Sequence, residues 1–357
     1  MFDFPLTRNS WRLDIVSILA VLGENNIKIH AQSITASKFS LLPRLLPAPQ
    51  ALLRETRPKR LPFETDVEVY GVRSGSQRSG LNYIPNLIHR VGEVRAYQVV
   101  DVEIARERRN RAVTYRSWAP LNLLAIGSCL LSLGLLIWSV LLRDGVAFIA
   151  ILVMSSATSA LGYASHWKRE NIMAKRSVRK NPPEKIVLKT RWGAFLVVQC
   201  DEDIARELYW APEECMYSMG NVASRAFGGV IGGLGVMIGV VLFGNCTWVM
   251  QAAIGSSYAF LNVSYWLITV IPENYSWDLS RFSVTVKHHD STTFTSALWQ
   301  SIMLTHSVRW VKANNIIPNS PAWKAWLDEA EQNLENDKWD PEQALTEHSD
   351  SNHITPV

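Results

Sequence analysis

The chain has 357 residues and a net charge of +4, from 36 Lys and Arg against 32 Asp and Glu. Hydrophobic residues make up 48% of the chain and 14 residues are Trp, a composition that excludes an intrinsically disordered protein. The charges are unevenly placed, because 117–142, 145–167 and 226–272 contain no Asp, Glu, Lys or Arg. A single water-soluble globule is therefore excluded as well.

Residues 1–62 are expected to form an irregular cytosolic segment. The stretch 41–62 is interrupted by prolines, which break helices. An alternative for the start of the chain stays open. Ile15–Leu22 is apolar and follows Arg8 and Arg12, so it could be the centre of a signal peptide.

Residues 63–117 are expected to form a cytosolic segment that contains strands. Thr65–Arg73 alternates between apolar and polar residues, and Val94–Ile104 contains a second alternating run. The stretch from Gly71 to Gly80 is rich in Gly and Ser and is predicted to be a flexible loop.

The charge-free runs predict membrane-spanning helices. About 20 apolar residues in a helix cross the roughly 30 Å hydrocarbon core of a bilayer. The run 226–272 is too long for one such helix, and the turn-like residues 244–247 divide it. The four predicted spans are 118–142, 146–167, 226–243 and 248–271. The predicted fold class is therefore an all-α polytopic membrane protein with four transmembrane helices and a small mixed α+β cytosolic portion.

Positive charge next to the spans predicts their orientation. The loop 168–225 and the residues before the first span are rich in Lys and Arg, whereas the two short turns carry no net positive charge. Both termini and this loop are therefore expected in the cytosol. Six basic residues could also bind anionic lipid headgroups, although their effect on topology already explains them and is the favoured interpretation. They are Lys168, Arg169, Lys175, Arg176, Arg179 and Lys180.

The remaining polar stretches contain further strand patterns. Lys185–Cys200 reads as two short strands, and Arg281–Lys287 alternates again. Amphipathic helices are expected within 273–335, and 336–357 is predicted to be a disordered acidic tail. Strands in three separate pieces suggest one mixed sheet assembled from non-adjacent sequence. Three independent tails are the alternative.

Glycines in the third predicted span are spaced for close helix packing. The run Gly233–Gly239 fits a loosened dinucleotide-binding pattern, but it lies inside an uncharged, membrane-length stretch. Small residues four positions apart instead let helix backbones approach each other closely. We expect this packing within the bundle, between copies of the chain or with other membrane proteins. The residues concerned are Gly228, Gly229, Gly232, Gly233, Gly235 and Gly239.

No catalytic, cofactor-binding or metal-binding residues are predicted. His288 and His289 could ligate a metal, but no further ligand follows at a recognisable spacing. The four cysteines form no CxxC pair. Acidic residues at 201–203 and in the C-terminal stretch offset the basic charge, which disfavours nucleic-acid binding. The lipid bilayer is therefore the principal expected partner.

Several blocks of sequence carry a resemblance to a group of proteins: 22–49, 66–73, 277–284 and the Trp-rich 296–330. In these blocks the chain resembles uncharacterised multi-pass membrane proteins of filamentous fungi. The resemblance implies an integral membrane protein and supplies no activity or site residues. Some of these proteins are similar to accessory genes of specialised-metabolite clusters.

The expected function is that of a non-enzymatic scaffold, assembly or regulatory component in a membrane. One alternative is an oligomeric channel or transporter built on the glycine-rich third span. The other is a membrane-bound enzyme or pathway accessory whose site lies in the cytosolic part.

Overall fold

A computed structural model describes residues 24–53, 57–107, 113–171, 183–336 and 338–353. The chain divides into two compact units, and each unit is built from three separate pieces of sequence. The first, called the bundle unit here, comprises Met1–Lys59, Val113–Glu170 and Cys215–Asp278. The second, the sheet unit, comprises Arg60–Ala112, Asn171–Glu214 and Leu279–Val357.

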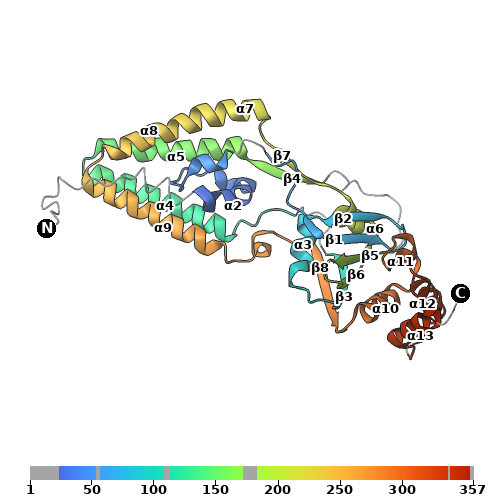
Figure 1. Cartoon of the computed structure of the whole chain (residues 1–357). Helices are drawn as coiled ribbons and strands as arrows, with labels where there is room; N and C mark the ends of the chain where they lie inside the picture. The colour runs from blue at the N-terminus through green and yellow to red at the C-terminus, as the bar shows by residue number, and fades with distance from the viewer. Residues whose placement is uncertain (1–23, 54–56, 108–112, 172–182, 337, 354–357) are drawn as a thin grey trace, which may run out of the picture. The chain divides into compact units, whose positions relative to one another are not determined.

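Long helices run side by side in the bundle unit (Figure 1). They are α4 (Pro120–Leu141), α5 (Gly145–Ser165), α8 (Leu234–Gly244) and α9 (Trp248–Ile268). The short helix α7 (Asn221–Ala226) and the π-helical η6 (Phe227–Gly233) lead into α8, so that one helix extends over Asn221–Gly244. Among the described residues, three helices are long and apolar enough to cross a membrane: Pro120–Leu141, Gly145–Ser165 and Asn221–Gly244.

The expected all-α fold with four transmembrane helices is wrong. The protein is mixed α/β, with a six-stranded sheet, and α9 is not among the helices apolar enough to cross a membrane. α9 carries no charge, but Gln251, Asn262 and several Ser, Tyr and Trp residues lower its hydropathy. α9 is long enough to cross a membrane and free of charge, but its hydropathy is too low for it to be a candidate span.

The N-terminal stretch 24–52 packs into the bundle unit. It forms α2 (Glu24–Ala36), η2 (Lys38–Leu41) and η3 (Pro49–Leu52). Their apolar residues belong to one buried cluster with residues of α4, α5 and α9, among them Ile27, Leu46, Leu161 and Tyr265. Side chains on the outer faces of the long helices are large and apolar, such as Leu130, Ile149 and Met237, each of which is exposed. Such a surface is stable in lipid and unfavourable in water.

The sheet unit contains a six-stranded mixed sheet in the order β2-β1-β5-β6-β3-β8. Its strands are β1 (Glu64–Gly71), β2 (Gln77–Leu81), β3 (Val99–Arg106), β5 (Pro183–Thr190), β6 (Phe195–Asp201) and β8 (Phe282–His289). β3 and β6 are parallel, and the other neighbours are antiparallel. The sheet therefore combines strands from all three pieces of the sheet unit, which confirms the mixed sheet expected from non-adjacent sequence. β4 (Trp167–Asn171) and β7 (Glu213–Tyr217) form a separate two-stranded sheet.

Helices cover the sheet. On one side lie α10 (Phe294–Thr305), α11 (Arg309–Ala313), α12 (Pro321–Gln332) and α13 (Pro341–His353), drawn orange to red in Figure 1. Their core contains Trp310 and Trp326, both fully buried, together with Val99, Phe195 and Val197 of the strands. The unit also contains α3 (Tyr83–His89), η4 (Val91–Glu93), α6 (Glu202–Ala205) and the π-helical η5 (Arg206–Trp210). α13 lies in the stretch that was expected to be a disordered tail.

Candidate functional site

β8 is a full-length strand at the edge of the six-stranded sheet. All eight of its residues are in register with β3, from Phe282 opposite Arg106 to His289 opposite Val99. Every residue after Phe282 is exposed. An edge strand carries backbone N–H and C=O groups that no neighbouring strand satisfies, so it can accept a further strand.

The pairing register shows which backbone groups of β8 point outward. The N–H of Phe195 in β6 donates to the Gln98 carbonyl at 3.0 Å, and the N–H of Glu107 donates to the Arg281 carbonyl, also at 3.0 Å. Even-numbered residues of β3 therefore bond to β6, and odd-numbered residues bond to β8. Residues that share hydrogen bonds in an antiparallel pair lie directly opposite each other. The backbone N–H and C=O groups of the odd-numbered residues of β8 therefore point toward β3. The N–H and C=O groups of Val284, Val286 and His288 face outward.

The side chains along this edge are apolar in the middle and basic at the end. Val284 is 39% exposed and Val286 is 45% exposed. Lys287, His288 and His289 follow directly and are also exposed. Natural edge strands are commonly protected by proline, bulges or charged side chains, especially Lys. β8 contains no proline and its pairing with β3 shows no register shift, but Lys287 is a side chain of the protecting kind. Within the part of the chain that the structure describes, no strand pairs with this edge, and the uncharged stretch before Lys287 is open to pairing.

A buried ion cluster fixes the start of β8. The Glu207 carboxylate is only 4% exposed, and it accepts from Arg106 at the end of β3 at 2.7 Å. It also accepts from Arg281, next to β8, at 3.0 Å. Removing one partner of a buried ion pair leaves an uncompensated charge, which is strongly destabilising. This cluster holds the last residues of β3 and the first of β8 against η5.

The predicted packing glycines fall into two sets. A Cβ on Gly232 would lie 2.6 Å from Leu161, and one on Gly235 would lie 2.8 Å from Ala157. Gly228 and Gly239 similarly face Ala164 and Met154. All four neighbours belong to α5, so this face packs within the chain. A Cβ on Gly229 or Gly233 would meet nothing within 4 Å.

Two of the six predicted lipid-binding residues are within the described part of the chain. Lys168 is exposed and Arg169 is half-buried, both in β4. Lys175, Arg176, Arg179 and Lys180 lie outside the described residues. Contact of these residues with anionic lipid stays a prediction.

A buried arginine in the bundle unit was missed by the sequence analysis. Arg44 is 1% exposed, and its Nη1 donates to the Phe39 carbonyl at 2.5 Å. The neighbouring Leu45 inserts its backbone against α4, where its N–H donates to Ser132 Oγ at 2.8 Å and its carbonyl accepts from Ser128 Oγ. The signal was available as a single Arg within the apolar LLPRLLP stretch, but that stretch was interpreted as irregular and cytosolic.

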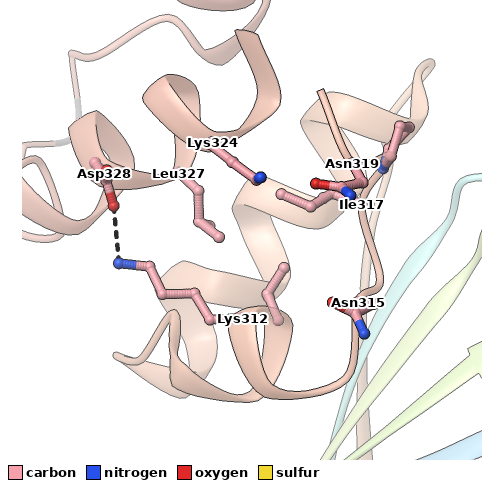
Figure 2. A pocket seen from close by; sticks show the side chains of 9 residues that line it. Lys312, Asn315, Ile317, Asn319, Lys324, Leu327 and Asp328 are labelled. Carbon is pink, nitrogen blue, oxygen red and sulfur yellow. Dashed lines mark hydrogen bonds and ion pairs between the residues drawn. The ribbon is translucent and has the colours of Figure 1, made fainter. Parts of the chain in front are cut away.

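A surface pocket of about 350 Å³ lies between α11 and α12 in the sheet unit (Figure 2). Lys324 points toward Ile317 and Asn319, whereas Lys312 points toward Asp328 and binds it at 2.9 Å. The nine residues that line the pocket include Lys312, Lys324 and Asp328 and no His, Cys, Ser or Tyr. Lys312 and Asp328 are already paired with each other.

Burial shifts the pKa of two side chains in the sheet unit, those of His89 and Cys200. The His89 ring nitrogen Nε2 lies 2.6 Å from the Tyr209 hydroxyl. Burial lowers the pKa of His89 to about 4, so the ring is neutral at pH 7. Burial also raises the pKa of the Cys200 thiol to about 12, which keeps it protonated and a poor nucleophile. Among the described residues, no group of three His, Cys, Asp or Glu is placed to hold a metal ion.

Comparison with known proteins does not assign the chain to a family. No protein-family description matches the sequence, and neither a curated protein nor a solved structure shows significant similarity to the chain. The candidate site is therefore defined by geometry alone: an open, partly apolar and partly basic edge of a mixed sheet.

Proposed function

We propose that the protein is a membrane-anchored, non-enzymatic assembly component that uses the β8 edge to bind a strand of another protein molecule. The open edge is the observation that carries this proposal. Strand addition to a sheet edge draws affinity from main-chain hydrogen bonds and specificity from alternate side chains. β8 offers both, with outward backbone groups at Val284, Val286 and His288 and exposed side chains at the same positions.

Membrane anchoring is supported by the bundle unit. Its three candidate spanning helices and exposed apolar faces suit a lipid environment. The chain segment 113–170 is inserted between β3 and β5 of one sheet and contains the candidate spans Pro120–Leu141 and Gly145–Ser165. Because one sheet cannot be assembled from strands on opposite sides of a bilayer, these two helices would cross the membrane as a hairpin that begins and ends on the same side.

The sheet unit is assigned to the cytosolic side by the distribution of charge. Arg116, Lys168 and Arg169 flank the candidate spans Pro120–Leu141 and Gly145–Ser165, and Arg225 lies near the start of Asn221–Gly244. At the opposite end, the turn between α4 and α5 carries Arg143 next to Asp144. Positive charge concentrates on the cytoplasmic side of membrane proteins. This assignment makes the protein multi-pass, with both the sheet unit and the C-terminus in the cytosol.

Photo-crosslinking in native membranes tests the proposed function. A benzoylphenylalanine at His288 should give a protein adduct of defined mass, and one at exposed Lys338 serves as the matched control. Val286→Pro removes one outward N–H and leaves the pairing with β3 intact, so the adduct should fall at least tenfold. Val286→Thr keeps the N–H and should retain the adduct. Absence of any protein adduct at position 288, or equal yields in both variants, would contradict the proposal.

A further inference from the structure

We infer that the surface pocket between α11 and α12 binds a small organic acid, with its carboxylate on Lys324 and its apolar part against Ile317 and Leu327. The pocket belongs to the sheet unit, and none of its lining residues is part of the β8 edge. The assignment is therefore independent of the proposed function. Three features of the pocket support it: an apolar floor, one unpaired ammonium group and a neighbouring amide.

Apolar side chains form the floor of the pocket. Leu327 is buried in the aromatic core of the sheet unit, and Ile317 packs against the same core while staying partly exposed. Figure 2 shows both side chains pointing into the same space. The volume of about 350 Å³ lies within the range of small-molecule sites, which are mostly apolar with a few polar groups. Because the floor is part of the packed core, it offers a preformed surface for a compact aromatic or hydrocarbon group.

The ammonium group of Lys324 carries the unpaired charge. Asp328 follows Lys324 by four residues on α12, a spacing at which oppositely charged side chains pair on a helix surface. Asp328 instead binds Lys312 of α11 at 2.9 Å, and Lys324 points the other way, toward Ile317 and Asn319 (Figure 2). In the part of the chain that the structure describes, the Lys324 ammonium forms no ion pair and no hydrogen bond. Lys324 is therefore available to a carboxylate of a ligand.

Lys312 compensates the acidic side chains beside the pocket. It binds Asp328 and also Glu331, the latter at 2.7 Å. These hydrogen bonds raise the pKa of Lys312 above its ordinary value, so Lys312 stays charged and occupied at neutral pH. Of the lining residues, Lys312, Lys324 and Asp328 carry charge, which leaves the lining with one positive charge in excess. This excess favours an anionic ligand over a cationic one.

The amide of Asn319 supplies a hydrogen-bond donor next to the ammonium. Asn319 lines the pocket, and Lys324 points toward it in Figure 2. Over the described ranges, the Asn319 side chain forms no hydrogen bond within the chain. A carboxylate accepts several hydrogen bonds, and those that involve a charged partner are the strongest. An ammonium and an amide above an apolar floor thus match a carboxylate attached to an apolar group.

Titration calorimetry on the full chain in lipid nanodiscs, with phenylacetate as the probe, tests binding. Lys324→Met removes the charge and keeps an apolar side chain, so the affinity should fall by about tenfold. Lys324→Arg keeps the charge and should retain most of the affinity. Lys338→Met, at another exposed lysine of the sheet unit, is the matched control and should bind as the unaltered protein does. Phenylacetamide has nearly the same shape and no charge, and it should bind about tenfold more weakly than phenylacetate.

Protection from acetylation locates the bound probe. With phenylacetate at ten times its dissociation constant, acetylation of Lys324 should slow by about tenfold, measured by mass spectrometry of peptides. Acetylation of Lys338 should not change. Equal binding of phenylacetate and phenylacetamide, unchanged affinity in Lys324→Met, or unprotected Lys324 would overturn the inference. It would also be overturned if phenylacetate, hexanoate and indole-3-acetate all fail to bind. Loss of the photo-adduct at His288 contradicts the proposed function alone and leaves this site standing.

Discussion

The bundle unit and the sheet unit are stabilised by different means. In the bundle, Gly232 and Gly235 let α8 approach α5, and the hydroxyls of Ser128 and Ser132 bond to the inserted backbone of Leu45. In the sheet unit, large aromatic side chains fill the core, and Trp299 and Trp339 pack with ring centroids 4.5 Å apart. The hydrophobic effect drives packing in water and is nearly absent between helices in lipid. Small residues and hydrogen bonds therefore carry more of the packing in the bundle.

The largest expected effect is on the aromatic core of the sheet unit. Trp326 is fully buried, and its indole N–H donates to the Pro341 carbonyl at 2.8 Å. Trp326→Ala should lower the free energy of unfolding of this unit by about 3–5 kcal/mol. Leu130→Ala, at a residue 63% exposed on the bundle surface, is the contrasting change. Thermal unfolding in detergent should show little loss for Leu130→Ala, and equal losses would remove the distinction between the units.

A close backbone contact gives the next largest effect, in the bundle. A Cβ on Gly162 would lie 2.2 Å from the Ser40 carbonyl oxygen, and backbone cannot yield as a side chain can. Gly162→Ala should destabilise the bundle by about 3 kcal/mol, the upper part of the range for overpacking. The matched control is Gly134→Ala in α4, because a Cβ there meets nothing within 4 Å. Denaturation monitored by far-ultraviolet circular dichroism compares the two variants. A neutral Gly162→Ala would show that η2 does not pack on α5 as described.

Acid should weaken the sheet unit through His89. Its folded pKa of about 4 lies below the ordinary value of 6.5 because burial disfavours the charged ring. Between these two values the unfolded chain binds a proton that the folded chain does not. Stability attributable to His89 is therefore complete above about pH 6.5 and falls as pH drops toward 4, by about 2 kcal/mol between pH 7 and 5. His89→Gln should flatten this part of the profile of unfolding free energy against pH. If His89→Gln leaves the profile of unfolding free energy against pH unchanged, a group other than His89 causes the loss of stability in acid.

A shared cap in the bundle is expected to have a smaller effect. Asp144 accepts from the Ala147 N–H at 2.9 Å and from the Thr247 N–H at 2.8 Å, so one carboxylate joins the turns that begin α5 and α9. Burial raises the pKa of Asp144, but these hydrogen bonds outweigh burial and the net pKa is lowered. Asp144→Ala should cost about 1–2 kcal/mol, in line with the loss of helix caps. Asp144→Asn keeps one acceptor oxygen and should cost less. Identical melting curves for the three proteins would show that the turns are joined by other contacts.

The sequence predicts the two units to different extents. Charge-free runs located α4, α5 and α8 because lipid-facing helices need long apolar stretches, and alternation located β1, β3 and β8. Two local errors have physical causes. The Gly/Ser-rich stretch at 71–80 contains the start of β2, whose pairing with β1 is a tertiary contact. α9 is free of charge and still too polar to be a candidate span.

The candidate site depends on topology more than on composition. Alternation in Arg281–Lys287 predicts a strand, but only the strand order shows that β8 lies at the edge. Likewise, the Gly spacing predicts a packing face, but α5 as its neighbour is visible only in the folded chain. The fixed direction of the outward N–H groups follows from pairings between residues more than 170 positions apart, such as Glu107 with Arg281.

The central claim is that α4 and α5 cross a membrane as a hairpin. Labelling of single introduced cysteines with a membrane-impermeant maleimide tests it in sealed cells and after selective permeabilisation. Arg143→Cys lies in the turn between α4 and α5, and Lys338→Cys lies between α12 and α13; both positions are exposed. The account predicts that Arg143→Cys and Lys338→Cys are labelled from opposite sides of the membrane, with Lys338→Cys on the cytosolic side. Labelling of both from the same side would contradict it.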